Sequence, residues 1–368
     1  MPITRVRAYQ QLQPFRRGRY TMSHGGGAVA ESLVIRLDCD DGPTGYGEVA
    51  MIGAFYSDAF PAGARAGVAE LAPLLIGVDA TRPRAVLARL DASMRGQPYV
   101  KSAIDVACWD AAARAAGRPL CDVLGGRQCA SVALYNVVTA GGSDEEAVAL
   151  AHGLLAEGYR RLQVKVGGHA DADARRLRLI RDAVGRDVVL FADANGGFTT
   201  AGARRFLRAT HDIEYTLEQP CASYDACAAV RSACDRPLVL DESIESLGDL
   251  LRAQGDGVVD GITIKVSRVG GLTRAVLLRD VACELDVQVT IEDTGGASIA
   301  TAAYLHAGLG TPDRLRLHTV DFQRWFSVDN ATGLPPSVEG SQDVSPGPGL
   351  GVEVDVEALG APIVDTRA

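Results

Sequence analysis

The sequence lacks the features that mark several classes of protein. No apolar run approaches the ~18 residues that a membrane-spanning helix needs. Residues 1–20 carry five arginines without the apolar segment of a signal peptide, and none of the eight cysteines forms a Cys-x-x-Cys pair. Acidic residues outnumber basic ones by 46 to 37, and a net charge of −9 disfavours nucleic acid and anionic lipid as partners. We therefore expect a cytoplasmic globular protein with reduced cysteines and no nucleic-acid or membrane partner.

Lysine is also scarce. The chain has 34 arginines but only three lysines, Lys101, Lys165 and Lys265. Arginine stays protonated in proteins, whereas the pKa of a buried lysine can move toward neutral pH. Positions that keep lysine in an arginine-rich chain are therefore candidates for proton chemistry, the alternative being that they have no special role.

Short segments rich in β-forming residues alternate with helix-length segments from residue 131 onward. Eight such segments match the strand count of a (β/α)8 barrel better than that of an open sheet. Helix signals lie between them: Ser143 and Glu146 form a capping box, Thr199 opens another helix, and Gly270-Gly271 precedes a third. The expected strands cover residues 131–138, 161–166, 188–195, 215–220, 237–243, 261–268, 287–294 and 314–322.

The chain before the barrel is patterned as a smaller α+β domain. The expected fold class is therefore α/β: an N-terminal α+β capping domain over residues 1–125, then a (β/α)8-type barrel over residues 126–322. Residues 323–368 are expected to return to the capping domain through an edge strand at 352–356. The capping domain is expected to hold strands at 3–10, 32–38 and 46–49 and helices at 62–75, 83–94 and 101–116.

Three acidic residues stand at the ends of consecutive barrel strands. Alternate side chains of a barrel strand face inward, and those at its carboxyl end meet the active site. This rule brings Asp193, Glu218 and Asp241 to one cavity, where three carboxylates without a counter-ion would repel one another. A divalent cation that prefers oxygen ligands resolves the repulsion, which predicts a Mg²⁺ site. The alternative is that each acid pairs with an arginine, although these strands contain only Arg161 and Arg268.

Two of the lysines end strands two and six, which face each other across an eight-stranded barrel. A divalent cation nearby favours the neutral form of lysine, so Lys165 and Lys265 can serve as general bases near pH 7. The cation would also stabilise the negative charge that develops on a substrate carboxylate when the α-proton leaves. A Schiff-base aldolase that uses either lysine is the alternative from another mechanistic class. Lys101 begins a helix and can contact Asp105, so we expect an anchoring role for it.

Other side chains at the strand ends are expected to support this chemistry. Strand seven delivers one of two acids, Glu292 or Asp293, and Gly295-Gly296 behind it could cradle an anion. His318 on strand eight is expected to be a packed histidine rather than a ligand. The supporting residues around the metal and the lysines are expected to be Gln163, Asn195 and Glu242.

Five strand-end motifs follow one another along the chain: Val164-Lys165-Val166, Asp193-Ala-Asn195, Glu218-Gln-Pro220, Asp241-Glu-Ser243 and Lys265-Val-Ser267. In this order they resemble the enolase superfamily, in its muconate-lactonizing branch, over nearly the whole chain. The resemblance implies a capping domain, Mg²⁺ held by Asp193, Glu218 and Asp241, acid/base lysines at 165 and 265, and a homo-oligomer. The sequence departs from the family at Gln163, where the first lysine of a Lys-x-Lys motif is usual.

Within that branch the chain is similar to cis-3-hydroxy-L-proline dehydratases and to proline-betaine and hydroxyproline-betaine epimerases, through segments 20–23, 99–105, 162–168, 218–221 and 291–294. In cis-3-hydroxy-L-proline the α-hydrogen and the hydroxyl lie on opposite ring faces. Anti elimination therefore needs a base on one side and an acid on the other, which two opposed lysines supply. The same pair would serve a racemase or epimerase of a proline-like, betaine or N-substituted amino acid. Segment 294–297 lacks the tryptophan of those relatives, which argues against a betaine.

The small domain is expected to set specificity for a small amino-acid substrate. The Gly-rich loop 23–27 and the segment 51–60 could close over the barrel mouth and exclude water. The candidate substrate contacts are Tyr20, Ser23, Phe55, Tyr56, Asp293, Thr294 and Trp325.

Overall fold

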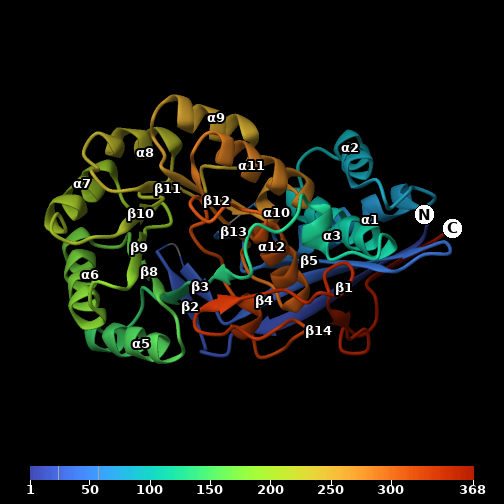
Figure 1. Cartoon of the computed structure of the whole chain (residues 1–368), viewed down its shortest axis with the longest axis horizontal. Coiled ribbons are helices and arrows are strands. Elements are labelled where there is room, and N and C mark those ends of the chain that lie inside the picture. The colour runs from blue at the N-terminus through green and yellow to red at the C-terminus, as the bar shows by residue number, and fades with distance from the viewer. Residues whose placement is uncertain (24, 57) are drawn as a thin grey trace.

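The computed structural model describes residues 1–23, 25–56 and 58–368. A curled parallel sheet ringed by helices forms one half of the molecule, and an antiparallel sheet covered by three helices forms the other (Figure 1). The two termini lie side by side at the end of the antiparallel sheet that is far from the barrel, because Arg5 and Arg367 are paired in neighbouring strands.

The N-terminal sheet has the strand order β17-β1-β4-β5 and is antiparallel throughout. Its helices each have proline in the first turn, where the missing N–H removes no helical hydrogen bond. Helix α3 approaches β5 closely, since a side chain at Gly45 or Gly47 would collide with the α3 backbone. The bounds are β1 Ile3–Pro14, β4 Val29–Cys39, β5 Gly45–Met51 and β17 Val364–Arg367, with α1 Pro61–Leu75, α2 Pro83–Ser93 and α3 Pro98–Ala115.

The C-terminal segment returns to this sheet, but not through the expected strand. Residues 352–356 contribute β16 (Glu353–Val354), which pairs with β14 (Ala331–Thr332). The edge strand beside β1 is β17 instead. Residues 352–356 alternate apolar and polar side chains, and alternation identifies a strand without identifying its partner.

The barrel sheet runs β13-β12-β11-β10-β9-β8-β7, with every neighbouring pair parallel. Helices cover its outer surface, as the first barrel helices on the left of Figure 1 show. The strands are β7 Asn136–Val138, β8 Arg161–Lys165, β9 Val189–Asp193, β10 Thr216–Glu218, β11 Leu238–Leu240, β12 Gly261–Lys265 and β13 Gln288–Glu292. The helices are α5 Asp144–Ala156, α6 Ala170–Val184, α7 Thr200–Ala209, α8 Tyr224–Arg231, α9 Leu247–Gly255, α11 Leu272–Glu284 and α12 Ser298–Leu309.

Shorter elements connect these parts. They are the hairpin β2 (Tyr20–Met22) and β3 (Gly25–Gly27), the pair β6 (Val132–Ala133) and β15 (Ser341–Gln342), and the helical turns α4 (Leu120–Val123), α10 (Val266–Val269) and η1 (Phe322–Arg324). The expected helix signals are confirmed: Ser143 and Glu146 form the capping box of α5, and Thr199 caps α7.

The eighth expected strand, 314–322, is not a continuous strand. Its backbone bonds to β13 are made with Val289, whose N–H donates to the carbonyl of Leu315 at 2.7 Å and whose carbonyl accepts from Leu317 at 2.9 Å, and the hydroxyl of Thr319 donates to the carbonyl of Ile291 at 2.6 Å. On its other side, Thr319 exchanges two 2.9 Å bonds with Ala133 and Tyr135. The segment crosses from one edge of the sheet to the other and so completes the ring with few bonds on either side. Likewise, the expected strand 261–268 ends at Lys265, and α10 follows.

Lys101 has an anchoring role, but its expected contact with Asp105 is wrong. Its Nζ donates to Asp91 Oδ1 at 2.9 Å and to the carbonyl of Met94 at 2.6 Å, which ties α3 to the end of α2. Asp105 instead accepts from the backbone N–H and the hydroxyl of Thr273, at 2.9 and 2.6 Å. A carboxylate at the N-terminus of α11 satisfies free N–H groups and the helix dipole, which explains this preference.

No helix in the described ranges is both long and apolar enough to cross a membrane. All eight cysteines are free.

Candidate active site

Lys165 and Lys265 end strands β8 and β12, and three strands, β9 to β11, lie between these two in the sheet. The two side chains therefore stand on opposite sides of the barrel. Both line one small cavity of about 30 Å³, and they are only 4% and 5% exposed.

Each lysine is paired with carboxylates. Lys165 Nζ lies 2.5 Å from Asp193 Oδ2, and Lys265 Nζ lies 2.6 Å from Glu292 Oε1 and 3.4 Å from Asp241 Oδ2. Burial alone would lower the pKa of both lysines, but the carboxylate charges outweigh it and raise the pKa of each. A lysine that is neutral near pH 7, as the sequence suggests, therefore requires those negative charges to be compensated.

The three expected metal ligands lie on adjacent strands. Glu218 is the Cα partner of Asp193, and Asp241 follows the next strand, β11. Burial, and then the charges of Asp193 and Asp241, raise the pKa of Glu218 well above its ordinary value. Glu218 accepts hydrogen bonds from Gln163 Nε2 at 2.9 Å and from Thr263 Oγ1 at 2.8 Å, so Gln163 lies beside one of the expected metal ligands.

Arginine pairing, the alternative to a metal, applies to Asp241. Arg268 binds both its carboxylate and its backbone carbonyl. Burial would raise the pKa of Asp241, but Arg268 and then Lys265 outweigh it and lower that pKa. Asp193 pairs with Lys165 instead. Among the described residues, neither Arg161 nor Arg268 forms an ion pair with Glu218, which accepts its hydrogen bonds from uncharged side chains.

The residues around the cavity fit a hard divalent cation by charge and by donor type. Asp193, Glu218, Asp241, Glu292 and Asp293 are each at most 3% exposed, and among the residues that the structure describes their ion-pair partners are three, Lys165, Lys265 and Arg268. Buried carboxylates in excess of cations are unfavourable unless a further positive charge joins them. The described residues contain no group of three side chains already arranged around a metal position, because Asp193 and Asp241 are turned to their cationic partners.

Asn195 and Glu242 form a supporting pair beside the carboxylates. Asn195 Nδ2 donates to Glu242 Oε1 at 3.1 Å, and the backbone N–H of Asn195 donates to Asp193 Oδ1 at 2.8 Å. Burial, and then the charge of Asp241, raise the pKa of Glu242 to about 7. The pair thus helps to fix Asp193, with Asn195 in a left-handed backbone conformation at φ 44°.

Five of the seven expected substrate contacts line the cavity: Tyr20, Tyr56, Asp293, Thr294 and Trp325. Tyr56 donates to Asp241 at 3.3 Å and accepts from Arg268 at 2.9 Å. Ser23 and Phe55 do not line it. Ser23 Oγ donates to the carbonyl of Ala194 at 2.9 Å, and Phe55 is 40% exposed. His24 and Ser57, which belong to the two expected closing segments, lie outside the described residues.

Of the two acids on strand seven, Glu292 is the one that contacts a lysine. Its Oε2 also accepts from the Tyr135 hydroxyl at 2.7 Å. Asp293 instead accepts hydrogen bonds from the backbone N–H groups of Ser267 at 3.1 Å and of Thr294 at 2.8 Å. Strand register could have found this difference, since Glu292 is the Cα partner of Lys265. Tyr135 and Arg268 lie outside the strand-end motifs. The sequence marks Arg268 only as one of two arginines that could pair with an acid, and it does not mark Tyr135.

His318 and the Gly295-Gly296 segment have structural roles beside the site. His318 is packed between the rings of Tyr135 and Phe191, at 4.5 and 4.2 Å, and burial lowers its pKa well below the ordinary value. The Gly295-Gly296 segment before α12 does precede an anion-binding position, but the anion there is a carboxylate of the protein itself. The carboxylate of Glu48 accepts from the N–H groups of Ala297 and Ala300, both at 3.0 Å.

Comparisons with known proteins identify relatives of this chain. The family profile described as mandelate racemase/muconate lactonizing enzyme, N-terminal domain, matches residues 3–125, and the profile described as enolase C-terminal domain-like matches residues 146–359. The chain is 38% identical to a cis-3-hydroxy-L-proline dehydratase of Roseibium aggregatum over 99% of both chains. It is 26% identical to an N-succinyl-L-Arg/Lys racemase of Bacillus cereus, over 83% of this chain and 84% of the relative.

Solved structures give the same result. A mandelate racemase/muconate lactonizing enzyme structure from Roseovarius nubinhibens, complexed with magnesium, has a TM-score of 0.95 and 32% identity, and the match covers all of both chains.

Proposed function

This chain belongs to the mandelate racemase/muconate lactonizing enzyme family of the enolase superfamily, and we propose that it dehydrates a small β-hydroxylated amino acid, with cis-3-hydroxy-L-proline as the leading substrate. The observation that carries the proposal is the pair of buried lysines, Lys165 and Lys265, on opposite sides of one small cavity. The full-length similarity to a named dehydratase supports the choice of substrate.

The two lysines divide the reaction between the two faces of the substrate. One takes the α-proton, and the other gives a proton to the hydroxyl that leaves the β-carbon. In cis-3-hydroxy-L-proline these two groups lie on opposite ring faces, so both lysines can act without movement of the ring. Once the substrate has entered, the burial of both lysines keeps bulk water from the carbanion that forms when the α-proton leaves.

We propose that Asp193, Glu218 and Asp241 hold Mg²⁺, since a related structure is complexed with that ion. Bound there, the ion would stabilise negative charge on the substrate carboxylate and compensate the carboxylates that now raise the pKa of Lys165 and Lys265. The free cysteines fit a reducing compartment, and we propose the cytoplasm as the place of the reaction.

Racemisation or epimerisation of a proline-like amino acid is the second candidate. It needs the same two lysines, one to remove the α-proton and one to return a proton from the other face, and the Bacillus cereus relative is named as a racemase. The two reactions differ only in whether the β-carbon carries a leaving group.

A product assay in heavy water separates them. The purified protein with Mg²⁺ is incubated in D₂O with cis-3-hydroxy-L-proline, its trans-3 isomer, trans-4-hydroxy-L-proline and L-proline, and NMR follows the products. We expect loss of the hydroxyl and formation of a cyclic imino acid from the cis-3 isomer only. Deuteration at the α-carbon with loss of optical rotation, and no imino or keto product from any compound, would replace the dehydratase by the racemase.

A further inference from the structure

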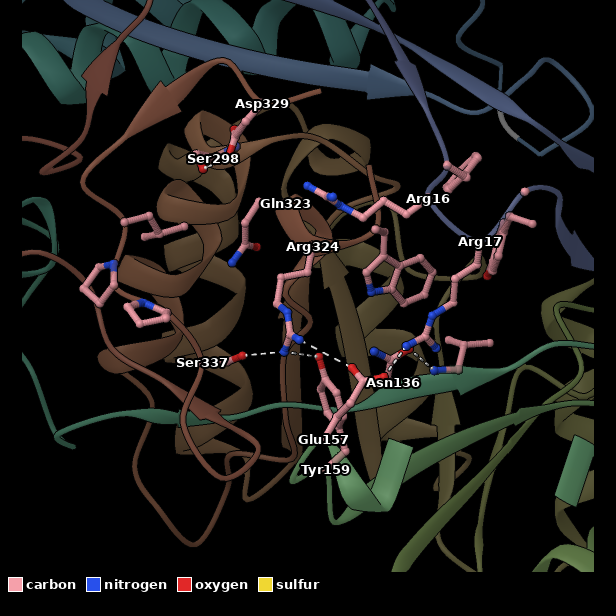
Figure 2. A pocket seen from close by; sticks show the side chains of 18 of the residues that line it. Arg16, Arg17, Asn136, Glu157, Tyr159, Ser298, Gln323, Arg324, Asp329 and Ser337 are labelled. Carbon is pink, nitrogen blue, oxygen red and sulfur yellow. Dashed lines mark hydrogen bonds and ion pairs between the residues drawn. The ribbon is translucent and has the colours of Figure 1, made fainter. Parts of the chain in front are cut away.

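A second and much larger cavity adjoins the catalytic one (Figure 2). Its volume is about 1100 Å³. It is bordered by residues 15–20 of the N-terminal domain, by β7, by α5 and the start of α12, and by segment 323–337 after the incomplete eighth strand. The two cavities have three lining residues in common, Phe15, Tyr20 and Trp325.

These three aromatic residues form the wall between the cavities. The ring centroids of Tyr20 lie 5.7 Å from Phe15 and 5.6 Å from Trp325, and Trp325 also packs against Phe322 at 4.9 Å. On its inner side the wall reaches the lysines, because Tyr20 and Lys165 line the same small cavity. Displacing Tyr20 would therefore connect the large cavity directly to Lys165.

A substrate needs such a connection. The catalytic cavity holds about 30 Å³, which is room for about one or two water molecules and not for an amino acid. The hairpin β2–β3, which carries Tyr20, forms a two-stranded sheet of its own among the described residues, so that few backbone bonds hold Tyr20 to the rest of the enclosure. A bond from Ser23 Oγ to the carbonyl of Ala194, at 2.9 Å, links it to the barrel.

The larger cavity is positively charged although the chain carries a net charge of −9. Four arginines line it, Arg16, Arg17, Arg19 and Arg324, against two acids, Glu157 and Asp329. Both acids are engaged. Glu157 pairs with Arg17 at 2.5 Å and with Arg324 at 3.4 Å, and Asp329 accepts from the N–H and hydroxyl of Ser298 at 2.9 and 2.8 Å. A cationic concavity on an acidic protein concentrates anionic groups there.

Arg16 is the arginine that remains available. Its guanidinium makes no hydrogen bond or ion pair with any residue in the described ranges, and Figure 2 shows it extending across the cavity toward Gln323. Two further polar atoms of the lining, Gln323 Oε1 and Trp325 Nε1, are buried and have no hydrogen-bond partner among the residues that the structure describes. A guanidinium and an indole N–H are donors for a carboxylate, and an amide oxygen accepts from an ammonium group.

We propose that this cavity is a vestibule that binds a free amino acid, with Arg16 on its carboxylate, before the ligand passes the Tyr20–Trp325 wall to the lysines. The amino-acid class of the ligand rests on the proposed function, whereas the site itself rests on the cavity, its charge and its unpartnered polar atoms. The wall residue Trp325 then contacts the ligand twice, first from the vestibule and then from the catalytic cavity.

Steady-state kinetics test the role of Arg16. We expect Arg16→Ala to lower kcat/KM about tenfold with kcat unchanged, because a lost capture contact leaves the chemistry behind the wall intact. Arg16→Lys, which keeps the charge but not the planar fork, is expected to recover part of the loss. Arg205→Ala is the matched control, since Arg205 is an exposed arginine on α7 outside both cavities. Equal kcat/KM for Arg16→Ala and wild type would overturn the proposal.

A binding measurement separates this proposal from the proposed reaction. The chain has two tryptophans, so Trp109→Phe leaves Trp325 as the reporter of the wall. We expect L-proline to change Trp325 fluorescence in this variant and in Trp109→Phe/Lys265→Ala, but not in Trp109→Phe/Arg16→Ala. If this fluorescence response is seen but the protein has no dehydratase activity, the vestibule proposal is supported and the proposed dehydration is contradicted. A response that needs Lys265 and not Arg16 would show binding in the catalytic cavity alone and contradict the vestibule.

Discussion

Glu292 holds Lys265 from the neighbouring strand, with 2.6 Å between Oε1 and Nζ. The two residues are Cα partners at the ends of β12 and β13, and Tyr135 donates to the other carboxylate oxygen at 2.7 Å. The carboxylate of Glu292, held by Tyr135, thus fixes the position of the Lys265 ammonium group. We therefore propose Glu292 as the positioning residue for Lys265, one of the two lysines to which we assign acid/base roles.

Removing the charge of Glu292 should weaken catalysis more than it weakens the fold. We expect Glu292→Gln, which keeps the size of the side chain, to lower kcat by about a hundredfold, the scale of one misplaced acid/base group. Tyr135→Phe removes only the outer hydrogen bond and should cost less than about tenfold. Steady-state kinetics with a thermal melt of each variant provide the check, and full activity of Glu292→Gln would contradict the positioning role.

Metal removal should abolish activity through the three carboxylates. We expect dialysis against EDTA to inactivate the enzyme and Mg²⁺ to restore it. Because an ion that binds only the folded state stabilises it by about 2.7 kcal/mol at a hundred times its Kd, Mg²⁺ should raise Tm. Glu218→Gln should lose this Mg²⁺-dependent rise, whereas Glu353→Gln, at an exposed position, should keep it. An equal rise in both variants would contradict the assignment of Glu218.

Glu48 joins the two halves of the molecule. Its carboxylate is 2% exposed and accepts from Gln13 Nε2 and Ser32 Oγ, both at 2.7 Å, as well as from the N-terminus of α12. Glu48→Ala would leave these buried donors without an acceptor, and we expect a loss of about 3 kcal/mol in the free energy of unfolding. Urea denaturation measures it, with Glu145→Ala as an exposed control; a loss below about 0.5 kcal/mol would contradict the role.

His306 should make the fold sensitive to acid. Its Nδ1 accepts from the N–H of Cys121 and its Nε2 lies 3.1 Å from the carbonyl of Leu350, so the buried ring is neutral. Burial lowers its pKa to about 4, below the ordinary value of 6.5. The neutral ring therefore stabilises the fold fully above pH 6.5, and this contribution is lost as pH falls to about 4.

The expected loss is about 1.4 kcal/mol for each pH unit in that range. Urea denaturation at a series of pH values measures it. His306→Gln should show a shallower dependence between pH 6.5 and 4, whereas the exposed His211→Gln should follow wild type. Identical slopes for His306→Gln and wild type would show that another group controls the acid sensitivity.

Much of the fold could be predicted from periodicity and helix signals. The capping box at Ser143 and the seven barrel strands follow local rules, because each element satisfies its own backbone and faces the core on a regular period. The irregular eighth strand and the pairing of β17 with β1 could not be predicted in this way. Both depend on which distant sheet edge remains unpaired once the rest of the chain has folded. The break of the sixth strand after Lys265 is likewise a tertiary feature.

The site was predictable where strand alternation determines it. Lys165, Lys265 and Asp193 line the cavity because their positions are set by alternation along parallel strands in register, and Glu218 is the Cα partner of Asp193 on the next strand. Side chains that reach the site from elsewhere were not predictable. Arg268 enters from the short helix α10, and its reach to Asp241 follows from a turn that no periodicity marks.

The central claim is that two opposed lysines act on the two faces of one α-carbon. Exchange of the α-hydrogen in D₂O, followed by NMR with cis-3-hydroxy-L-proline and with L-proline, tests it most directly in Lys165→Ala and Lys265→Ala. The account predicts that both variants lose dehydration, and that the one lacking the base also loses exchange while the one lacking the acid retains it. Dehydration at the wild-type rate in either variant would contradict the account.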